Sequence, residues 1–341
     1  MSLLTMPSGA LRGRILGLPA WPALIPDLPA TARTQVPEAI LGQALTWLLG
    51  NVDWLDPDQW NQHLRARPFP GTTVLELLVL CRRLPAGPLA HRLTERCLDA
   101  AQAIVEDPAF VAGLYGADPA FTYRVWLLAL LSEFGRPVDD LNDAAQCLLD
   151  TGCGDLTNLG RQPYAALELR YALDLGGFTS NLPDLEQLYS RTMLAHRADP
   201  LYLSDNEAYA ITHILFYLSD FGRRAPFVGD PAGLARLRGL IGTLLGSYLA
   251  RNDLDLSAEL MLCAQLVGMG EHELVRHGWR RLADTQREDG HIPGPLYRQA
   301  ARDRLDGVKA GAYTFGTSYH TTVVTALAAA ERERRHGSEP H

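Results

Sequence analysis

One kind of segment recurs along this chain and limits its fold more than any other feature. In the clearest copies, polar or aromatic residues occupy the first turns, apolar residues fill the body, and glycine stands at the end. These copies cover residues 120–135, 164–178, 206–222 and 255–270, and weaker copies cover 72–85 and 317–332. The apolar positions follow the helical period of about 3.6 residues, and a terminal glycine is a common helix stop. The repeat therefore predicts six apolar helices.

Amphipathic segments that carry charges separate these apolar helices. They cover approximately residues 37–50, 88–105, 138–150, 183–197, 231–250 and 271–287. A helix that is apolar on most sides must be buried on most sides. We therefore expect an all-α (α/α)6 toroid of six helical hairpins, with the apolar helices in an inner ring and the amphipathic helices outside. An open solenoid of helix pairs is the alternative, but it would expose one face of each apolar helix.

The toroid is expected to span residues 37–335, after a proline-rich N-terminal arm (1–36) and before a flexible C-terminal tail (336–341). Arginines and prolines interrupt the apolar part of the N-terminus, so we do not expect a signal peptide. No stretch reaches the ~18 uncharged apolar residues of a membrane span. The five cysteines form no CxxC pair, which indicates reduced thiols in a cytoplasmic protein.

The charge of the chain excludes one class of partner. The formal net charge is −8, and no block of basic residues is present. Nucleic acid needs a basic surface for its phosphates and is therefore not an expected partner. The chain also lacks a GxSxG elbow, a phosphate-binding loop, a dinucleotide fingerprint and HExxH. The oligomeric state stays open.

The toroid predicts the place of a functional site. The inner helices run parallel, so their N-terminal ends meet at one mouth, where free N–H groups and helix dipoles favour an anionic ligand or ionised side chains. Polar residues in the opening turns are therefore the candidates. They are Glu76, Tyr123, Arg124, Tyr164, Glu168, Asp205, Glu207, His213, Asp253, Asp255, Glu259, Tyr319 and His320.

Residues 203–218, LSDNEAYAITHILFYL, are the most informative of these openings. When the terminal glycines Gly222 and Gly268 are aligned, His213 and Glu259 fall at equivalent positions of two neighbouring inner helices. We expect them to form an acid/base pair or to share a metal. The same offset matches Glu207, a further catalytic candidate, with Asp253.

Other candidates have simpler explanations beside the functional one. Asp205 is expected to cap its helix, and one of Asp253 and Asp255 is expected to do the same. Arg161 either holds an anionic group of the substrate or pairs with an outer helix. His291, in a loop rich in turns, either reaches the mouth or faces solvent, and we expect solvent. The candidates for substrate binding are Tyr123, Arg161, Tyr164, Glu168, Tyr209 and Tyr319.

Two short motifs resemble those of a known superfamily. Residues 278–292, GWRRLADTQREDGHI, resemble the aromatic–aliphatic–Gln–Gly repeat of terpenoid cyclases and protein prenyltransferase β subunits. Trp279, Leu282, Gln286 and Gly290 match that repeat, and Ile292 stands where an aromatic residue is usual. Residues 319–322, YHTT, are similar to the Tyr-His-Thr opening of the last inner helix in prenyltransferase β subunits.

The resemblance implies roles for three residues. In prenyltransferase β subunits that histidine binds zinc together with an Asp-x-Cys, so His320, Asp253 and Asp255 correspond to the ligands. Asp-Leu-Asp-Leu-Ser-Ala, from Asp253 on, also resembles the DxDD-Thr-Ala motif of class II cyclases, in which the residue matching Asp255 protonates an alkene or epoxide. The chain has aspartate in place of the zinc-ligand cysteine, and Leu256 in place of the last motif carboxylate.

We therefore expect an enzyme of small-molecule, specialised metabolism that is similar to a cyclase, lyase or transferase. In one mechanism, His320, His213 and the carboxylates of Asp253 and Asp255 hold a divalent metal, zinc or magnesium. In the other, a buried carboxylic acid, Asp255 or Glu259, stays protonated through desolvation and acts as general acid with His213. The expected substrate is a small molecule with an apolar body. A carbohydrate-active enzyme with paired carboxylates and a non-catalytic helical-repeat binding module are the alternatives.

Overall fold

The computed structural model describes residues 30–65, 69, 71–153, 163–196, 198–226 and 231–337, with side chains from residue 35 on. Every regular element in these ranges is a helix, and none is a strand. The described helices include none that is both long and apolar enough to cross a membrane.

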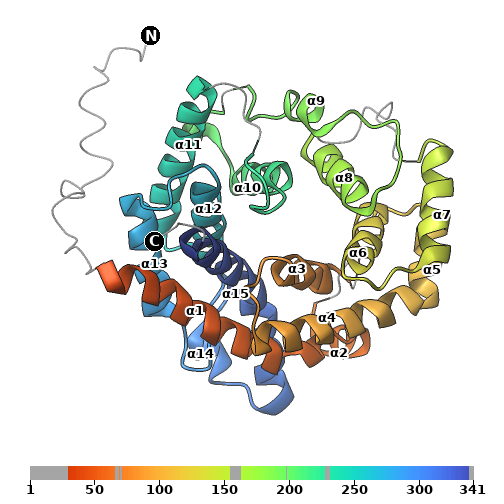
Figure 1. Cartoon of the computed structure of the whole chain (residues 1–341). Coiled ribbons are helices and arrows are strands. Elements are labelled where there is room, and N and C mark those ends of the chain that lie inside the picture. Colours follow the sequence, from red (N-terminus) through yellow and green to blue (C-terminus); the bar gives the residue numbers. More distant parts are fainter. Residues whose placement is uncertain are drawn as a thin grey trace, which may run out of the picture.

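Twelve helices form two concentric rings, which confirms the predicted (α/α)6 toroid (Figure 1). The inner ring consists of α3 (Thr72–Cys81), α6 (Phe121–Glu133), α8 (Pro163–Gly176), α10 (Asp205–Ser219), α12 (Leu254–Leu266) and α15 (Gly307–Gly337). The outer ring consists of α1 (Ala30–Gly50), α4 (Pro88–Glu106), α7 (Asp139–Asp150), α9 (Leu185–Tyr189), α11 (Pro231–Ala250) and α13 (Glu273–Thr285). Shorter elements join them: the 3-10 helices η2 (Val52–Leu55) and η3 (Pro200–Tyr202), and α2 (Pro57–His63), α5 (Pro108–Tyr115) and α14 (Gln299–Arg302).

Two helices differ in length from the prediction. Helix α15 begins ten residues early because Phe315 is buried among Trp47, Trp54 and Trp60, and this packing outweighs the glycines of the segment. Helix α9 ends at Tyr189, although its pattern continues to residue 197. The hydroxyls of Ser190 and Thr192 bond to nearby carbonyls and compete with helical N–H groups there.

The outer helix α13 packs closely against the inner helix α12 at a glycine. All residues of α12 are buried, as its apolar sequence requires. On α13, a Cβ at Gly278 would lie 2.3 Å from the sulfur of Met261 on α12. Glycine at this position therefore lets α13 approach the inner ring.

The ring closes where the first and last hairpins meet. The Gln286 side chain donates hydrogen bonds to the carbonyls of Ile40 in α1 (3.2 Å) and Gly290 (2.8 Å). Gly290 has φ = +102°, and a Cβ there would lie 2.2 Å from the carbonyl oxygen of Gln43. Gln286 and Gly290 of the motif at 278–292 thus hold the loop after α13 against α1.

Ion pairs bridge the C-terminal ends of the inner helices. Arg82, just after α3, contacts Asp220 (Nη1–Oδ1, 2.9 Å), the C-cap of α10, and Glu133 (Nε–Oε2, 2.6 Å), at the end of α6. Tyr171 on α8 donates to the same Asp220 oxygen (2.7 Å). These contacts cross-link the end of the ring opposite to the predicted mouth.

Candidate functional site

A cavity of about 130 Å³ lies inside the ring, and all six inner helices contribute to its wall. Its polar lining consists of Thr72, Glu76, Tyr123, Glu168, His213, Glu259 and His320, all but His213 from the first half of their helices. The deeper lining is mostly apolar and aromatic: Val79, Trp126, Phe216, Tyr217, Phe221, Val323, Val324 and Leu327. The cavity is thus amphipathic, with its ionisable groups on the side of the helix N-termini.

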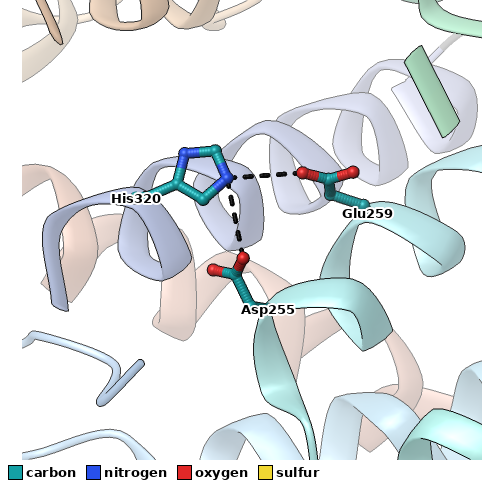
Figure 2. Close-up of side chains that lie close together, drawn as sticks. All are labelled: Asp255, Glu259 and His320. Carbon is teal, nitrogen blue, oxygen red and sulfur yellow. Dashed lines mark hydrogen bonds and ion pairs between the residues drawn. The ribbon is translucent and has the colours of Figure 1, made fainter. Parts of the chain in front are cut away.

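His320 lies among three carboxylates at the polar end of the cavity. Its Nε2 is 3.3 Å from Oε1 of Glu259 and 3.7 Å from Oδ2 of Asp255, and its Nδ1 is 3.3 Å from Oε2 of Glu76. Figure 2 shows Asp255 and Glu259 reaching from α12 toward the same nitrogen of His320 on α15. Asp255 and Glu259 are four residues apart, so one helix face presents both.

Hydroxyl groups hold the two carboxylates of α12 in place. Asp255 accepts hydrogen bonds from Tyr209 on α10 (2.6 Å) and from Thr321 on α15. Glu259 accepts one from Thr212 on α10. Asp255 and Glu259 are buried, and each has an oxygen that also faces His320. Three inner helices therefore fix the geometry of this cluster.

The electrostatics of the cluster favour a proton on His320. Burial disfavours the charged imidazole, but Asp255, Glu76 and Glu259 outweigh burial and raise the pKa of His320 well above its ordinary value. Burial likewise acts to raise the pKa of Glu259, but His213, His320 and Thr212 stabilise the carboxylate and lower its pKa overall. Glu259 is therefore ionised, and the expectation that desolvation keeps it protonated is wrong.

His213 also faces the cavity, one helical turn after Tyr209. Its Nδ1 lies 2.8 Å from the Tyr209 carbonyl oxygen and 3.8 Å from Oε2 of Glu259. A carbonyl oxygen can only accept, so Nδ1 carries a proton, and in the neutral ring Nε2 is the basic nitrogen. The structure thus brings together His213 and Glu259, which the alignment of glycines had paired.

A second set of polar side chains comes from three other helix positions: Glu168 on α8, Tyr123 on α6 and Tyr217 on α10. Tyr217 donates a hydrogen bond to Oε1 of Glu168 (2.7 Å). The pKa of Tyr123 is raised to about 12, chiefly by the negative charge of Glu168. Burial and the charge of Glu76 act in the same direction. Tyr123 is thus a neutral hydroxyl that lines the cavity together with Glu168 and Glu76.

Several predicted site residues serve the helix ends instead. Ser204, and not Asp205, caps α10, and Glu207 completes a capping box with it, so the Glu207 carboxylate is engaged outside the cavity lining. Asp205 pairs with Arg251 (3.0 Å). Asp253 caps α12 by accepting from the N–H of Leu256, and it does not belong to the cluster around His320.

Other candidates point away from the cavity. Tyr319 is buried against Trp60 and Phe315, and Tyr164 is 41% exposed, and neither lines the cavity. Arg124 pairs with Asp118. Arg161 lies outside the described residues.

His291, expected in solvent, is buried instead. It packs on Trp47 and Tyr297, and its Nδ1 lies 2.6 Å from Asp289. Its imidazole thus belongs to the packing between the last loop and α1.

The hydroxyl residues Thr212 and Thr321 were not among the predicted site residues. Each of them follows or precedes a candidate by one position, but threonine is common in buried helices and carries no signal of its own. Only the register between neighbouring helices reveals them.

Asp255, Glu259 and His320 form a group that could hold a metal ion. One ligand atom from each lies within 4.8 Å of the others. Neither Asp253 nor His213, both of them predicted ligands, belongs to this group.

Comparisons with known proteins agree with this architecture. Residues 41–330 match the family described as a domain of unknown function, DUF6895, and the chain belongs to that family. No curated protein matches it. Among solved structures, it is similar to a variant of the type II terpene cyclase MstE from Scytonema, in complex with its substrate geranylgeranyl dihydroxybenzoate. The TM-score is 0.51 at 11% identity, over 89% of this chain and 99% of that chain, which shows a shared fold.

Proposed function

We propose that this member of the DUF6895 family is an enzyme of small-molecule metabolism whose active site is the central cavity, and that Asp255, Glu259 and His320 hold a divalent metal there. The spacing of the three ligand atoms carries the proposal. Direct N–H···O hydrogen bonds measure about 2.7–3.2 Å, whereas Nε2 of His320 lies 3.3 and 3.7 Å from its two carboxylate partners. Ligands at about 2.0–2.1 Å from one tetrahedral ion are separated by about 3.3 Å.

The surroundings of the three ligands support a metal as well. Protein metal sites orient each ligand through hydrogen bonds from a further layer of residues. Here Thr321 and Tyr209 bond to Asp255, Thr212 bonds to Glu259, and Glu76 faces the second nitrogen of His320. One imidazole and two carboxylates suit zinc better than magnesium, which prefers oxygen ligands and water.

The remaining groups of the cavity would bind the substrate and move protons. A divalent ion in this position supplies Lewis acidity toward an oxygen atom of the substrate or a water. His213 presents its Nε2 as a base, and its Nδ1 lies 3.8 Å from Oε2 of Glu259. The apolar and aromatic residues hold the body of the substrate and exclude water. At about 130 Å³, the cavity suits a body of roughly benzene size, because apolar cavities of about 150 Å³ bind benzene.

Cyclisation, elimination or group transfer on such a substrate fits this arrangement, and the likeness to a terpene cyclase supports the first. We place the enzyme in the cytoplasm, because Cys81, Cys97, Cys147 and Cys263 are free thiols. A closed ring argues against a binding module with an open concave face. Trp126 is buried at the cavity wall and offers no exposed platform for a sugar ring, which argues against a carbohydrate-active enzyme.

Acid catalysis without a metal is the second candidate, because His320 is held protonated by three carboxylates. In that case His320, which lines the cavity, is the proton donor, and Asp255, which does not line it, positions the imidazole. An imidazolium with a raised pKa is a weak acid, so this mechanism suits protonation of a substrate oxygen and not of an alkene.

Metal binding to the purified protein tests the proposal. We expect one zinc per chain by elemental analysis and by calorimetric titration after chelation, and loss of that site in Asp255→Asn, Glu259→Gln and His320→Ala. Asp253→Asn is the matched control: asparagine also caps helices, and residue 253 lies outside the cluster, so this variant keeps the metal. Wild-type protein without stoichiometric metal, or equal loss in Asp253→Asn and Asp255→Asn, would contradict the metal site and leave acid catalysis.

A further inference from the structure

The charges that line the cavity are nearly all negative. Glu76, Glu168 and Glu259 come from three different inner helices and face the cavity, and Asp255 lies directly behind His320. No lysine or arginine is among the described residues of the lining, where the two histidines are the only groups able to carry positive charge. A cavity of this composition repels phosphate, diphosphate and carboxylate groups.

Aromatic rings surround the same space. Trp126 packs edge-on against Tyr171 and Tyr217, at 5.4 and 5.8 Å between ring centroids, and Phe216 stacks on Phe221 at 5.3 Å. The π faces of such rings attract organic cations, most strongly when water is excluded. Carboxylates at one end and aromatic faces at the other therefore favour a ligand that is both positively charged and apolar.

Trp126 gives an independent sign that a ligand belongs here. The residue is 4% exposed and lines the cavity, and its indole N–H finds no hydrogen-bond partner among the described residues. A buried donor without a partner is uncommon in folded proteins. An oxygen atom or an aromatic ring of a bound ligand would accept from this N–H.

We propose that the cavity binds a small organic cation, namely a protonated amine that carries an aromatic or oxygen-bearing body of about benzene size. The ammonium group lies beside Glu168 and Glu76, next to Tyr123, and the body lies against Trp126 and Phe216. The inference rests on the proposed function only in taking the cavity as the substrate site. It holds with or without a metal, because a divalent ion at the cluster neutralises Asp255 and Glu259 but leaves Glu76 and Glu168.

The test compares three probes of nearly equal shape and different charge. They are 2-phenylethylamine, which is cationic at neutral pH, the neutral 2-phenylethanol and the anionic phenylacetate. Calorimetric titrations are made with chelated protein and with zinc-loaded protein. We expect the amine to bind at least ~10-fold more tightly than the alcohol in both forms, and phenylacetate to bind most weakly to the chelated form.

A matched pair of variants locates the charge that selects the amine. Glu168→Gln keeps an acceptor for Tyr217 but removes the charge, so affinity for the amine falls ~10-fold while affinity for the alcohol is unchanged. Glu186→Gln, an exposed residue of α9, changes neither. The melting temperature of each variant, measured without a ligand, verifies folding.

The possible outcomes separate this inference from the proposed function. Equal affinity for amine and alcohol, tighter binding of phenylacetate to chelated protein, or binding of metal ions only would overturn the inference, even where the zinc site is confirmed. Selective amine binding to a protein that holds no metal would support the inference and contradict the metal site.

Discussion

A buried ion pair joins the first and last inner helices, and its two halves should contribute unequally to stability. Nη2 of Arg83, just after α3, lies 2.5 Å from Oε2 of Glu331 on α15, and the two side chains are only 1% and 3% exposed. Glu331 has a second partner, Arg335 (Nε–Oε1, 2.6 Å). In the described part of the chain, Nε and Nη1 of Arg83 find no hydrogen-bond partner.

Because the two residues differ in their partners, the two single substitutions should lower the free energy of unfolding by different amounts. Glu331→Leu leaves a buried guanidinium without a counter-charge, which costs about 3–5 kcal/mol. Arg83→Met leaves Glu331 paired with a half-exposed arginine, so we expect about 1–2 kcal/mol, close to the cost of one lost buried hydrogen bond. With an unfolding entropy of about 2.1 cal/mol/K per residue, the first change lowers the melting temperature by roughly 4–7 °C.

Urea denaturation of both variants and of the double variant Arg83→Met/Glu331→Leu measures these costs. The double variant should be more stable than Glu331→Leu alone, because an apolar pair replaces the stranded charge. Equal destabilisation by the two single changes, or a double variant less stable than Glu331→Leu, would show that Glu331 does not compensate the buried charge of Arg83.

Two further predictions concern the cluster and the opposite end of the ring. Thr212→Val removes the hydroxyl that bonds to Glu259, so we expect zinc affinity to fall ~10-fold or more in titrations, with Thr243→Val at an exposed position of α11 as an unaffected control. At the other end, burial acts to raise the pKa of Asp220, but Arg82 and Tyr171 outweigh it and lower that pKa overall. The pair therefore stabilises the fold above the unfolded-state pKa of about 3.9, and this contribution is lost as pH falls through the lower folded-state pKa. Urea denaturation between pH 6 and 2.5 should show Asp220→Asn less stable than wild type at pH 6, with a smaller difference at pH 2.5, whereas a constant difference would contradict the assignment.

The architecture could be predicted from the sequence because burial on all sides leaves a strong compositional signal. Helix α12 illustrates this, since its mostly apolar sequence placed it in the inner ring. The lengths of α9 and α15 could not be predicted, because hydroxyl competition and aromatic packing act against local preference.

The candidate site could be predicted in position but only partly in residues, because closeness to a helix start does not determine which face a side chain occupies. Tyr319 and His320 are neighbours, about 100° apart around α15, and of the two only His320 lines the cavity. Asp255 and Glu259 are four residues apart and share a face, whereas Asp253 precedes the helix and caps it. Helical periodicity, applied to these candidates, would have favoured Asp255, Glu259 and His320 over Asp253 and Tyr319.

The helix dipoles explain only part of why carboxylates accumulate inside the ring. Asp255 lies in the first turn of α12, where the dipole stabilises an anion by about 0.3–1 kcal/mol, and up to ~2 kcal/mol in partly buried sites. Glu259 and Glu168 lie a turn deeper, where this effect has largely decayed. The effective cost of burying a carboxylate is several kcal/mol, so the dipoles cannot offset it. The cluster therefore needs a compensating cation: a proton on His320 or, under our proposal, a divalent ion at Asp255, Glu259 and His320.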